Sequence, residues 1–152
     1  MKHTLKLNEI QLNEISSQFY IEVRINRFKA KMLIDTGASQ TVISEKFASK
    51  LKLEAKDFIN DVSIGIADNQ LSPKLADIKL LQVEDIKIRD FQCIILPMEH
   101  INEAYKSIGE AIIDGIIGSE ILIFFNSLIN FKNNTLTLFS KNQDISFSNF
   151  FH

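Results

Sequence analysis

The chain has 152 residues, of which 45% are hydrophobic and 24% charged, and its formal net charge at pH 7 is -2. This length fits one compact domain with a substantial core, so we expect a single domain over residues 1–152. Lysine and arginine are scattered singly among acidic residues, and this pattern with the small negative charge argues against a nucleic-acid partner.

Cys93 is the only cysteine, which excludes an intrachain disulfide. The surrounding "DFQCIILP" supplies no activating base, so Cys93 is predicted to be a small buried hydrophobic residue. The histidines His3, His100 and His152 lie too far apart to have the spacing of zinc ligands, so we expect no metal site.

The N-terminal segment "MKHTLKLNEIQLNE" has polar residues where a signal peptide needs a hydrophobic region. The most hydrophobic segment, "AIIDGIIGSEILIFFNSLINF", is interrupted by acidic residues and glycines and is too polar to cross a membrane. These features predict no membrane partner and a cytoplasmic location, unless a leader has been trimmed from the chain.

The first half of the chain predicts a hairpin that leads to an acidic residue. Residues 19–25 alternate between apolar and polar side chains, the period of a half-buried strand. The turn "NRFK" follows, and "AKMLIDT" is predicted to form a second strand that ends at Asp35. After a turn at Gly37, "QTVIS" is another short strand, and Ser44 is predicted to cap a helix with Glu45 in its first turn.

The middle of the chain predicts a series of strands. "DVSIGI" and "LSPKLADIKL" flank an "ADNQ" turn, and "LLQV", "IKI" and "FQCIIL" are separated by "ED" and "RD" turns. "MEHINEAYKSIGEA" is the least strand-like part and is expected to be a loop with a short helix. Ser119 is predicted to cap a short helix over "EILIFF", and "SLINF" and "LTLF" bracket a further hairpin.

The last residues, from Lys141 onward, are polar apart from Phe147, Phe150 and Phe151. These aromatic residues are expected to cover an apolar surface on this chain or another, or to belong to a loosely attached tail. Many short strands at roughly ten-residue spacing, with one or two short helices, predict an all-β fold built as a small closed β-barrel or sandwich.

The stretch "MLIDTGASQTVIS" places one carboxylate, Asp35, in an otherwise apolar and hydroxyl-rich run. A buried aspartate is rare unless another group pairs with it or a reaction uses it. Gly37 permits a tight turn and exposes its backbone N–H to the carboxylate, and the Thr36 hydroxyl can fix the loop from the side. Apolar residues on both sides anchor the loop, as a preorganised site requires.

"DTGAS", preceded by "MLI" and followed by "TVIS", resembles the active-site loop of retropepsin-like aspartic proteases. Downstream, "DGIIGSEIL" resembles the second signature of that family, with Ile116, Ile117 and Gly118 as the hydrophobic–hydrophobic–glycine element that packs beneath the loop. The order of the elements also matches, and the resemblance covers about residues 19–139. It implies a closed acid-protease-type β-barrel.

The resemblance also implies roles for individual residues. Asp35 would be catalytic, and the rest of the loop would support it: Thr36, Gly37, Ala38 and Ser39. The flap that closes over a substrate would lie within Val62–Lys74, and its candidate substrate-binding residues are Ile64, Gly65, Ile66 and Ala67.

The reaction of this family needs two carboxylates, yet the chain has a single "DTG". Asp114 precedes "GIIG" rather than a Thr-Gly pair, and it is better explained as a surface turn residue. A second Asp35 is therefore expected from a second chain, in a symmetric homodimer that hydrolyses peptide bonds of a polypeptide substrate. The two carboxylates would share one proton and activate a water, with no metal or cofactor.

Two other functions are compatible with the same residues. The chain could be a peptide-binding or scaffolding module with the same fold, in which two Asp35 side chains never come together. A small-ligand barrel would need an interior cavity, whereas the abundance of isoleucine, leucine and phenylalanine argues for a filled interior.

Overall fold

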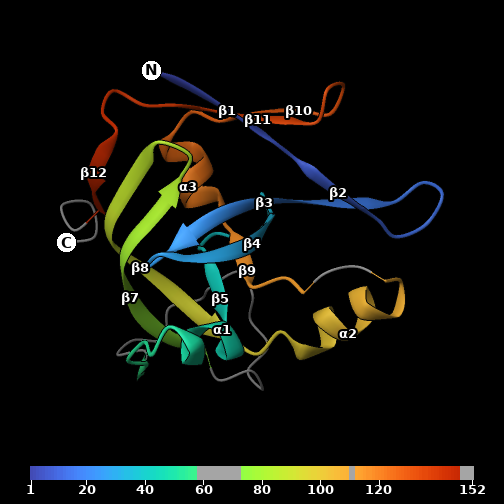
Figure 1. Cartoon of the computed structure of the whole chain (residues 1–152), viewed down its shortest axis with the longest axis horizontal. Helices are drawn as coiled ribbons and strands as arrows, with labels where there is room; N and C mark the ends of the chain where they lie inside the picture. The colour runs from blue at the N-terminus through green and yellow to red at the C-terminus, as the bar shows by residue number, and fades with distance from the viewer. Residues whose placement is uncertain (58–72, 110–111, 148–152) are drawn as a thin grey trace.

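The computed structural model describes residues 1–57, 73–109 and 112–147, and this part of the chain contains twelve strands and three short helices (Figure 1). The strands are β1 (Lys2–Lys6), β2 (Asn8–Gln11), β3 (Ser17–Ile25), β4 (Phe28–Ile34), β5 (Val42–Ser44), β6 (Lys56–Asp57), β7 (Lys74–Val83), β8 (Ile86–Leu96), β9 (Gly115–Ile117), β10 (Leu128–Asn130), β11 (Thr135–Phe139) and β12 (Asp144–Ser146). The helices are α1 (Glu45–Lys50), α2 (Glu99–Ser107) and α3 (Ser119–Phe124). Within the described ranges, no helix has the length and apolar character needed to cross a membrane.

Strands β8, β5, β9, β4, β3 and β7 are hydrogen-bonded in that order, and β7 pairs again with β8. This last pairing closes the sheet into a six-stranded barrel. The β7–β8 pair is antiparallel and long, whereas β4 pairs with β9 and β5 with β8 in parallel. The predicted all-β closed barrel is therefore confirmed.

Side chains fill the barrel interior. Its largest fully buried residues come from several strands and belong to one hydrophobic cluster, as shown by Ile21, Ile25, Ile78, Ile88 and Phe91. Each of these is at most 1% exposed. The packing agrees with the filled interior expected from the aliphatic and aromatic content, and it gives the strands a rigid base.

Local sequence signals explain the start of the barrel. Asn26 and Arg27 both have positive φ, 47° and 75°, which is the backbone of the two-residue turn that joins β3 and β4. At the end of β5, the Ser44 hydroxyl accepts a hydrogen bond of 3.1 Å from the Phe47 N–H. Ser44 is thus the predicted cap of α1.

Three local predictions are wrong in detail. The predicted "RD" turn lies inside β8, where Asp90 takes up a positive φ of 54° while pairing with β7 continues on both sides. Separate short strands were expected there, but the long β7–β8 pairing joins them, and only the "ED" turn separates β7 from β8. Ser119 is the first residue of α3 and Gly118 is its cap residue, without a side-chain cap bond.

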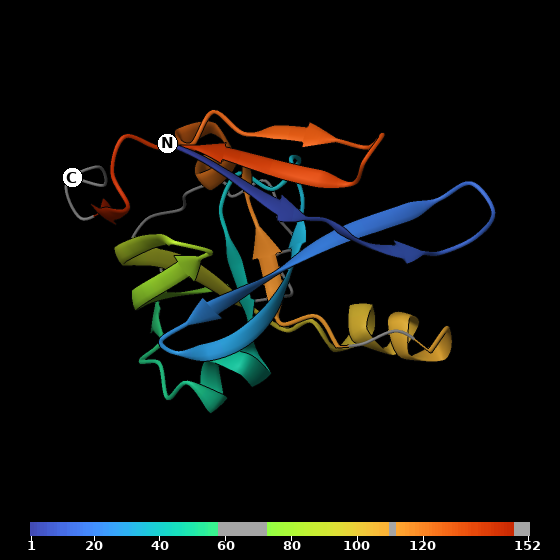
Figure 2. The same ribbon diagram turned by 45° about the horizontal axis from the view of Figure 1, so that its top comes forward.

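A second, three-stranded sheet lies across one end of the barrel (Figure 2). Its order is β1-β11-β10, so the N-terminal strand pairs with a strand near the other end of the sequence. Strands β10 and β11 form the hairpin predicted from "SLINF" and "LTLF". Strand β2 pairs instead with β3 and extends away from the barrel.

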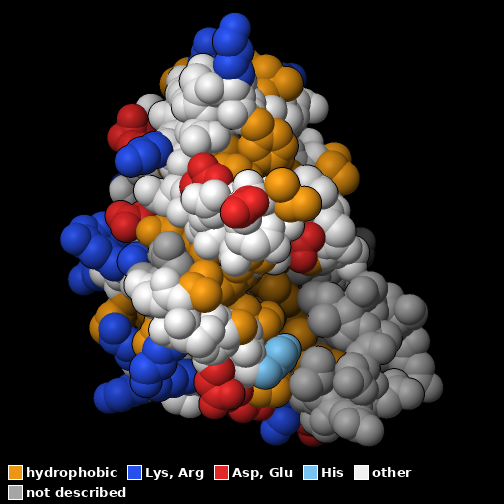
Figure 3. Space-filling model, turned by 90° about the vertical axis from the view of Figure 1, so that its right-hand side faces the viewer, with side chains coloured by type: hydrophobic (Ala, Val, Ile, Leu, Met, Phe, Trp, Pro, Cys, Tyr) orange, Lys and Arg blue, Asp and Glu red, His pale blue; other side chains and the backbone are white. Residues whose placement is uncertain are grey.

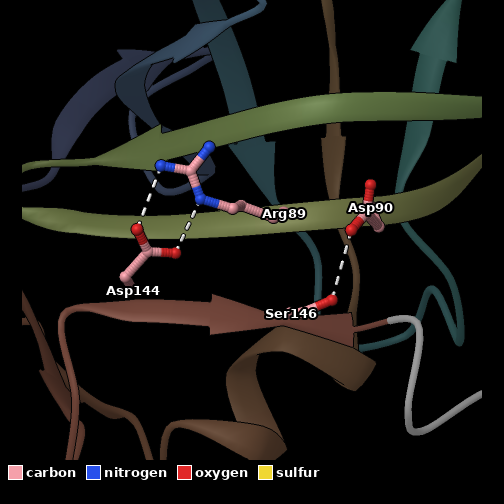
Figure 4. A network of polar contacts seen from close by, with 4 residues as sticks. All are labelled: Arg89, Asp90, Asp144 and Ser146. Carbon is pink, nitrogen blue, oxygen red and sulfur yellow. Dashed lines mark hydrogen bonds and ion pairs between the residues drawn. The ribbon is translucent and has the colours of Figure 1, made fainter.

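The described part of the C-terminal segment packs on its own chain. Strand β12 pairs in parallel with β8, and Figure 4 shows the Arg89 guanidinium donating to both Asp144 carboxylate oxygens, at 2.7 and 3.0 Å. Phe147 is buried. The centroid of its ring lies 5.4 Å from that of Phe91 and 4.7 Å from that of Phe124. Phe147 therefore covers an apolar surface of this chain, while the other two predicted aromatic residues, Phe150 and Phe151, lie outside the described residues.

Candidate active site

Asp35 is presented where β4 ends. The parallel pairing of β4 with β9 places Ile34 opposite Ile117, and the Asp35 N–H donates to the Ile117 carbonyl at 3.2 Å. Beyond this bond the backbone leaves the sheet, and the Asp35 side chain is exposed. The strand pairing thus fixes the backbone of Asp35 while its carboxylate stays accessible.

Gly37 holds the Asp35 carboxylate. Its N–H donates to Asp35 Oδ1 at 2.9 Å, as predicted from the sequence. Its φ does not lie in the left-handed region, so the turn itself does not require a glycine. A Cβ at this position would lie 3.2 Å from the same carboxylate oxygen, so a larger residue would press on the Asp35 side chain.

The other three loop residues differ in their environments. Thr36 and Ser39 are exposed. Within the described ranges the Thr36 hydroxyl makes no hydrogen bond, so this part of the chain does not form the predicted side-chain brace. Ala38 is buried, with 2% of its surface exposed. Its N–H donates to the Asp35 carbonyl at 3.2 Å and its carbonyl accepts from Ser119 N–H at 2.7 Å.

The hydrophobic–glycine element lies directly beneath this loop. Ile116 and Ile117 belong to β9, and Ile117 is 1% exposed. Gly118 is in such close contact with the loop that a Cβ there would lie 2.5 Å from the Gln40 carbonyl carbon. Only glycine fits this approach without a backbone shift, which explains the residue type at this place in the motif.

Two side chains that were not predicted from the sequence, Glu120 and Thr41, fasten the loop to α3. The Glu120 carboxylate accepts a hydrogen bond from the backbone N–H of Thr41 and another, at 2.9 Å, from its hydroxyl. The Thr41 hydroxyl oxygen in turn accepts from Gly118 N–H at 3.1 Å. Burial raises the pKa of the Glu120 carboxyl, and these hydrogen bonds partly offset that effect. An acid inside the apolar run "IIGSEILIFF" is the signal that could have revealed this contact.

Asp114 is a structural brace rather than a surface turn residue. It is half-buried, and its Oδ2 accepts a hydrogen bond of 2.9 Å from Lys31 N–H. The Asp114 N–H donates to the Lys31 carbonyl and its own carbonyl accepts from Ser44 N–H. Burial raises the pKa of this carboxyl. Asp114 therefore connects β4 and β5 below the loop, consistent with its exclusion as a second catalytic acid.

Two further predictions concern residues outside the loop. Cys93 is 1% exposed, and burial raises the pKa of its thiol to about 12, so it is the buried, unreactive residue that was predicted. The candidate flap residues Ile64, Gly65, Ile66 and Ala67 lie outside the described residues.

The sequence matches the profile of a known family, described as gag-polyprotein putative aspartyl protease, over residues 21–122. This match covers more than half of the chain and includes both the Asp35 loop and the hydrophobic–glycine element. The chain belongs to this retropepsin-like aspartyl protease family. No significant match to a curated protein sequence is found.

Solved structures show the same fold at low sequence identity. A retropepsin-like aspartic protease from Rickettsia conorii aligns with a TM-score of 0.58 and 16% identity, covering 91% of this chain and 90% of that chain. The retroviral protease-like domain of Ddi1 from Leishmania major aligns with a TM-score of 0.52 and 18% identity, covering 80% and 87%. EIAV protease complexed with the inhibitor HBY-793 aligns with a TM-score of 0.51 and 16% identity, covering 75% and 93%.

In this retropepsin-like chain, the residue that carries the family motif, Asp35, is also the residue whose carboxylate is both accessible and held in position. The carboxylate of the "DTG" loop is exposed, its backbone is held by β9, and its oxygen is held by a backbone N–H. Such a rigid, accessible carboxylate can accept a proton from water or donate one to a substrate.

Proposed function

We propose that the chain is an aspartic endopeptidase whose active unit is a homodimer, with one Asp35 from each subunit forming the catalytic pair. The observation that carries this proposal is the exposed Asp35 carboxylate, held by the Gly37 N–H in a loop that bears the family motif. The two acids of the second signature are already engaged, Asp114 by the Lys31 backbone and Glu120 by Thr41.

The mechanism follows from placing two carboxylates together. Two carboxylates about 3 Å apart cannot both ionise easily, so the pair holds one proton. The ionised Asp35 takes a proton from a bound water, whose oxygen attacks the carbonyl carbon of the scissile peptide bond. The protonated Asp35 donates its proton to the carbonyl oxygen, which gives a tetrahedral gem-diol. When the gem-diol collapses, the carboxyl that took the water proton gives a proton to the amide nitrogen, and the other carboxylate takes a proton from a gem-diol hydroxyl. The C–N bond then breaks, the amine leaves and the pair again holds one proton.

The loop supplies the rigidity that this chemistry requires. The Gly37 N–H fixes one carboxylate oxygen, and the Glu120–Thr41 contact fixes the C-terminal end of the loop against α3. A catalytic group that is already held in position loses little entropy on the way to the transition state.

The test is the Asp35→Asn variant assayed with fluorescence-quenched casein. Loss of general acid–base catalysis should lower the cleavage rate by about 10²–10⁴-fold while the fold is retained. Asp90→Asn is the matched control, because Asp90 lies on β8 with a positive φ that asparagine also tolerates. Cleavage by Asp35→Asn at the parent rate would contradict the proposal, and a folded dimeric parent that cleaves nothing would instead favour a peptide-binding module.

A further inference from the structure

Basic side chains that are far apart in the sequence gather around one pocket of the folded chain. The pocket has a volume of about 670 Å³ and lies between the β3–β4 turn, the end of α1 and the strands β6, β7 and β8. We call it the basic pocket, and its basic residues are Arg27, Lys52, Lys56, Lys79 and Arg89.

The protein as a whole is not basic, because its formal net charge is -2. On the face seen in Figure 3, lysine and arginine side chains lie mainly along one edge, while acidic and hydrophobic side chains occupy the middle. The acidic residues among the described lining of the basic pocket are Glu54 and Asp77. The fold therefore creates a local excess of positive charge, which favours an anionic ligand.

Three of these five cations are available to such a ligand. Lys56 pairs with Asp77 at 2.9 Å, and Arg89 is bound by the Asp144 carboxylate (Figure 4). The other three, which are Arg27, Lys52 and Lys79, are exposed and form no ion pair within the described ranges.

Arg27 occupies a backbone position that favours glycine. A two-residue hairpin turn with positive φ at both residues prefers Asn-Gly. Asn26 is the usual first residue, but Arg27 stands in the second place with a φ of 75°. The turn is fixed to β7, since the Asn26 N–H donates to the Leu80 carbonyl at 2.8 Å and the Asn26 Oδ1 accepts from the Leu80 N–H at 3.1 Å.

Lys52 also replaces the usual glycine, at the end of α1. Its φ is 57°, its N–H donates to the Ser49 carbonyl at 3.1 Å, and the Leu53 N–H donates to the Ala48 carbonyl at 3.0 Å. This is the helix ending in which glycine is the usual residue with positive φ. Among the described non-glycine residues with positive φ, Arg27 and Lys52 are the basic ones, and both line the basic pocket. A cation at a position where glycine would cost less indicates a role for the side chain itself.

The remaining lining favours a polypeptide over other anions. Three half-buried leucines, Leu51, Leu53 and Leu80, lie among the cations and offer apolar contacts that an inorganic anion does not use. Single-stranded nucleic acid is usually held by aromatic rings that stack on its bases. No aromatic side chain is present in the described lining of the basic pocket. Acidic residues interspersed with apolar ones match this surface best.

The basic pocket is separate from Asp35. The β3–β4 turn precedes β4, whereas Asp35 follows it, and β4 is seven residues long. At about 3.3 Å per residue, the two ends of this strand lie about 20 Å apart. Binding in the basic pocket is therefore independent of the proposed catalytic pair.

We infer that the basic pocket is a docking site for an acidic segment of a polypeptide, whose carboxylates pair with Arg27, Lys52 and Lys79 and whose apolar side chains contact the leucines.

Fluorescence anisotropy of a labelled peptide rich in glutamate and leucine, titrated with the Asp35→Asn chain, tests this docking site. The peptide should bind at low ionic strength, and added salt should weaken binding because the cations are exposed. Arg27→Gly and Lys52→Gly, combined in the same background, should raise the dissociation constant about tenfold. Glycine fits both backbone positions, so the urea unfolding midpoint should stay the same or rise, whereas it would fall if these side chains were needed for the fold.

Two control variants separate the effect of the basic pocket from those of net charge and backbone. Lys132→Gln combined with Lys141→Gln removes the same charge from exposed lysines that do not line the pocket. Asn134→Gly places glycine at another position with positive φ, 53°, before β11. Both controls should leave the dissociation constant within about twofold of the parent.

Competition identifies the class of ligand. The unlabelled peptide should displace the labelled one at concentrations at which inorganic phosphate and a short oligothymidylate do not. Displacement by either competitor at those concentrations would overturn the assignment to a polypeptide. No peptide binding, or a dissociation constant that the double glycine variant leaves unchanged, would overturn the docking site. Neither result bears on the dyad, which casein cleavage tests separately.

Discussion

The contact between Glu120 and Thr41 should contribute measurably to the stability of the loop that carries Asp35. Glu120→Ala removes the acceptor of the N–H and the hydroxyl of Thr41, and of the Ile121 N–H at its own helix start. Thr41 is 1% exposed, so water does not replace the lost acceptor easily. A buried donor left without a partner costs about 1–3 kcal/mol.

The net loss should be smaller than the sum of two such terms. Burying the Glu120 carboxylate itself carries a cost, which is reflected in its raised pKa, and the substitution removes that cost. We therefore expect Glu120→Ala to lower the free energy of unfolding by about 2–4 kcal/mol. Glu120→Gln keeps one acceptor oxygen but turns an NH₂ group toward the other donor, so about 1–2 kcal/mol is expected.

Urea unfolding in the Asp35→Asn background measures both values. Glu103→Ala is the matched control, because Glu103 is an exposed residue of α2, and it should change the free energy of unfolding by no more than about 0.5 kcal/mol. If Glu120→Ala matches this control, the Glu120–Thr41 contact does not hold the loop and the reasoning is refuted.

Burial raises the pKa of the Glu120 and Asp114 carboxyls, so the native chain binds their protons more tightly than the unfolded chain does. The free energy of unfolding should therefore fall as pH rises from the ordinary carboxyl range through the raised pKa values. Urea unfolding at several pH values should show a smaller fall in Glu120→Gln than in the parent. The same dependence of the free energy of unfolding on pH in both chains would argue against this. Cys93 should react with a thiol reagent only after unfolding, because it is buried and its pKa is raised to about 12, and rapid labelling of the native chain would disprove this. Gly118→Ala should destabilise the fold by about 1–3 kcal/mol, since its Cβ would lie 2.5 Å from the Gln40 carbonyl carbon, and an unchanged unfolding midpoint would contradict the close packing.

The parts of the fold that were predictable depend on local rules. Alternation over residues 19–25 and the Asn26–Arg27 turn specify the first hairpin, because side-chain periodicity and turn backbone are properties of a few neighbouring residues. The same holds for the Ser44 cap of α1. The bond between Gly37 and the Asp35 carboxylate spans two residues, so the sequence was sufficient to predict it.

The parts that were missed depend on contacts between distant residues. Glu120 and Thr41 are 79 positions apart, and nothing near either residue indicates that β9 brings them together. Asp114 looked like a surface residue because its partner, Lys31, lies on another strand. The predicted "RD" turn failed because the pairing of β7 with β8 on both sides of Asp90 outweighs the local turn preference.

The claim that one active site needs two Asp35 carboxylates can be tested by mixing wild-type and Asp35→Asn chains at a constant total concentration and following casein cleavage. If each active unit takes one Asp35 from each of two subunits, activity should fall with the square of the wild-type fraction, to about one quarter at an equal mixture. A linear fall, to about one half, would mean that each chain acts with its own Asp35 alone and would contradict the dyad.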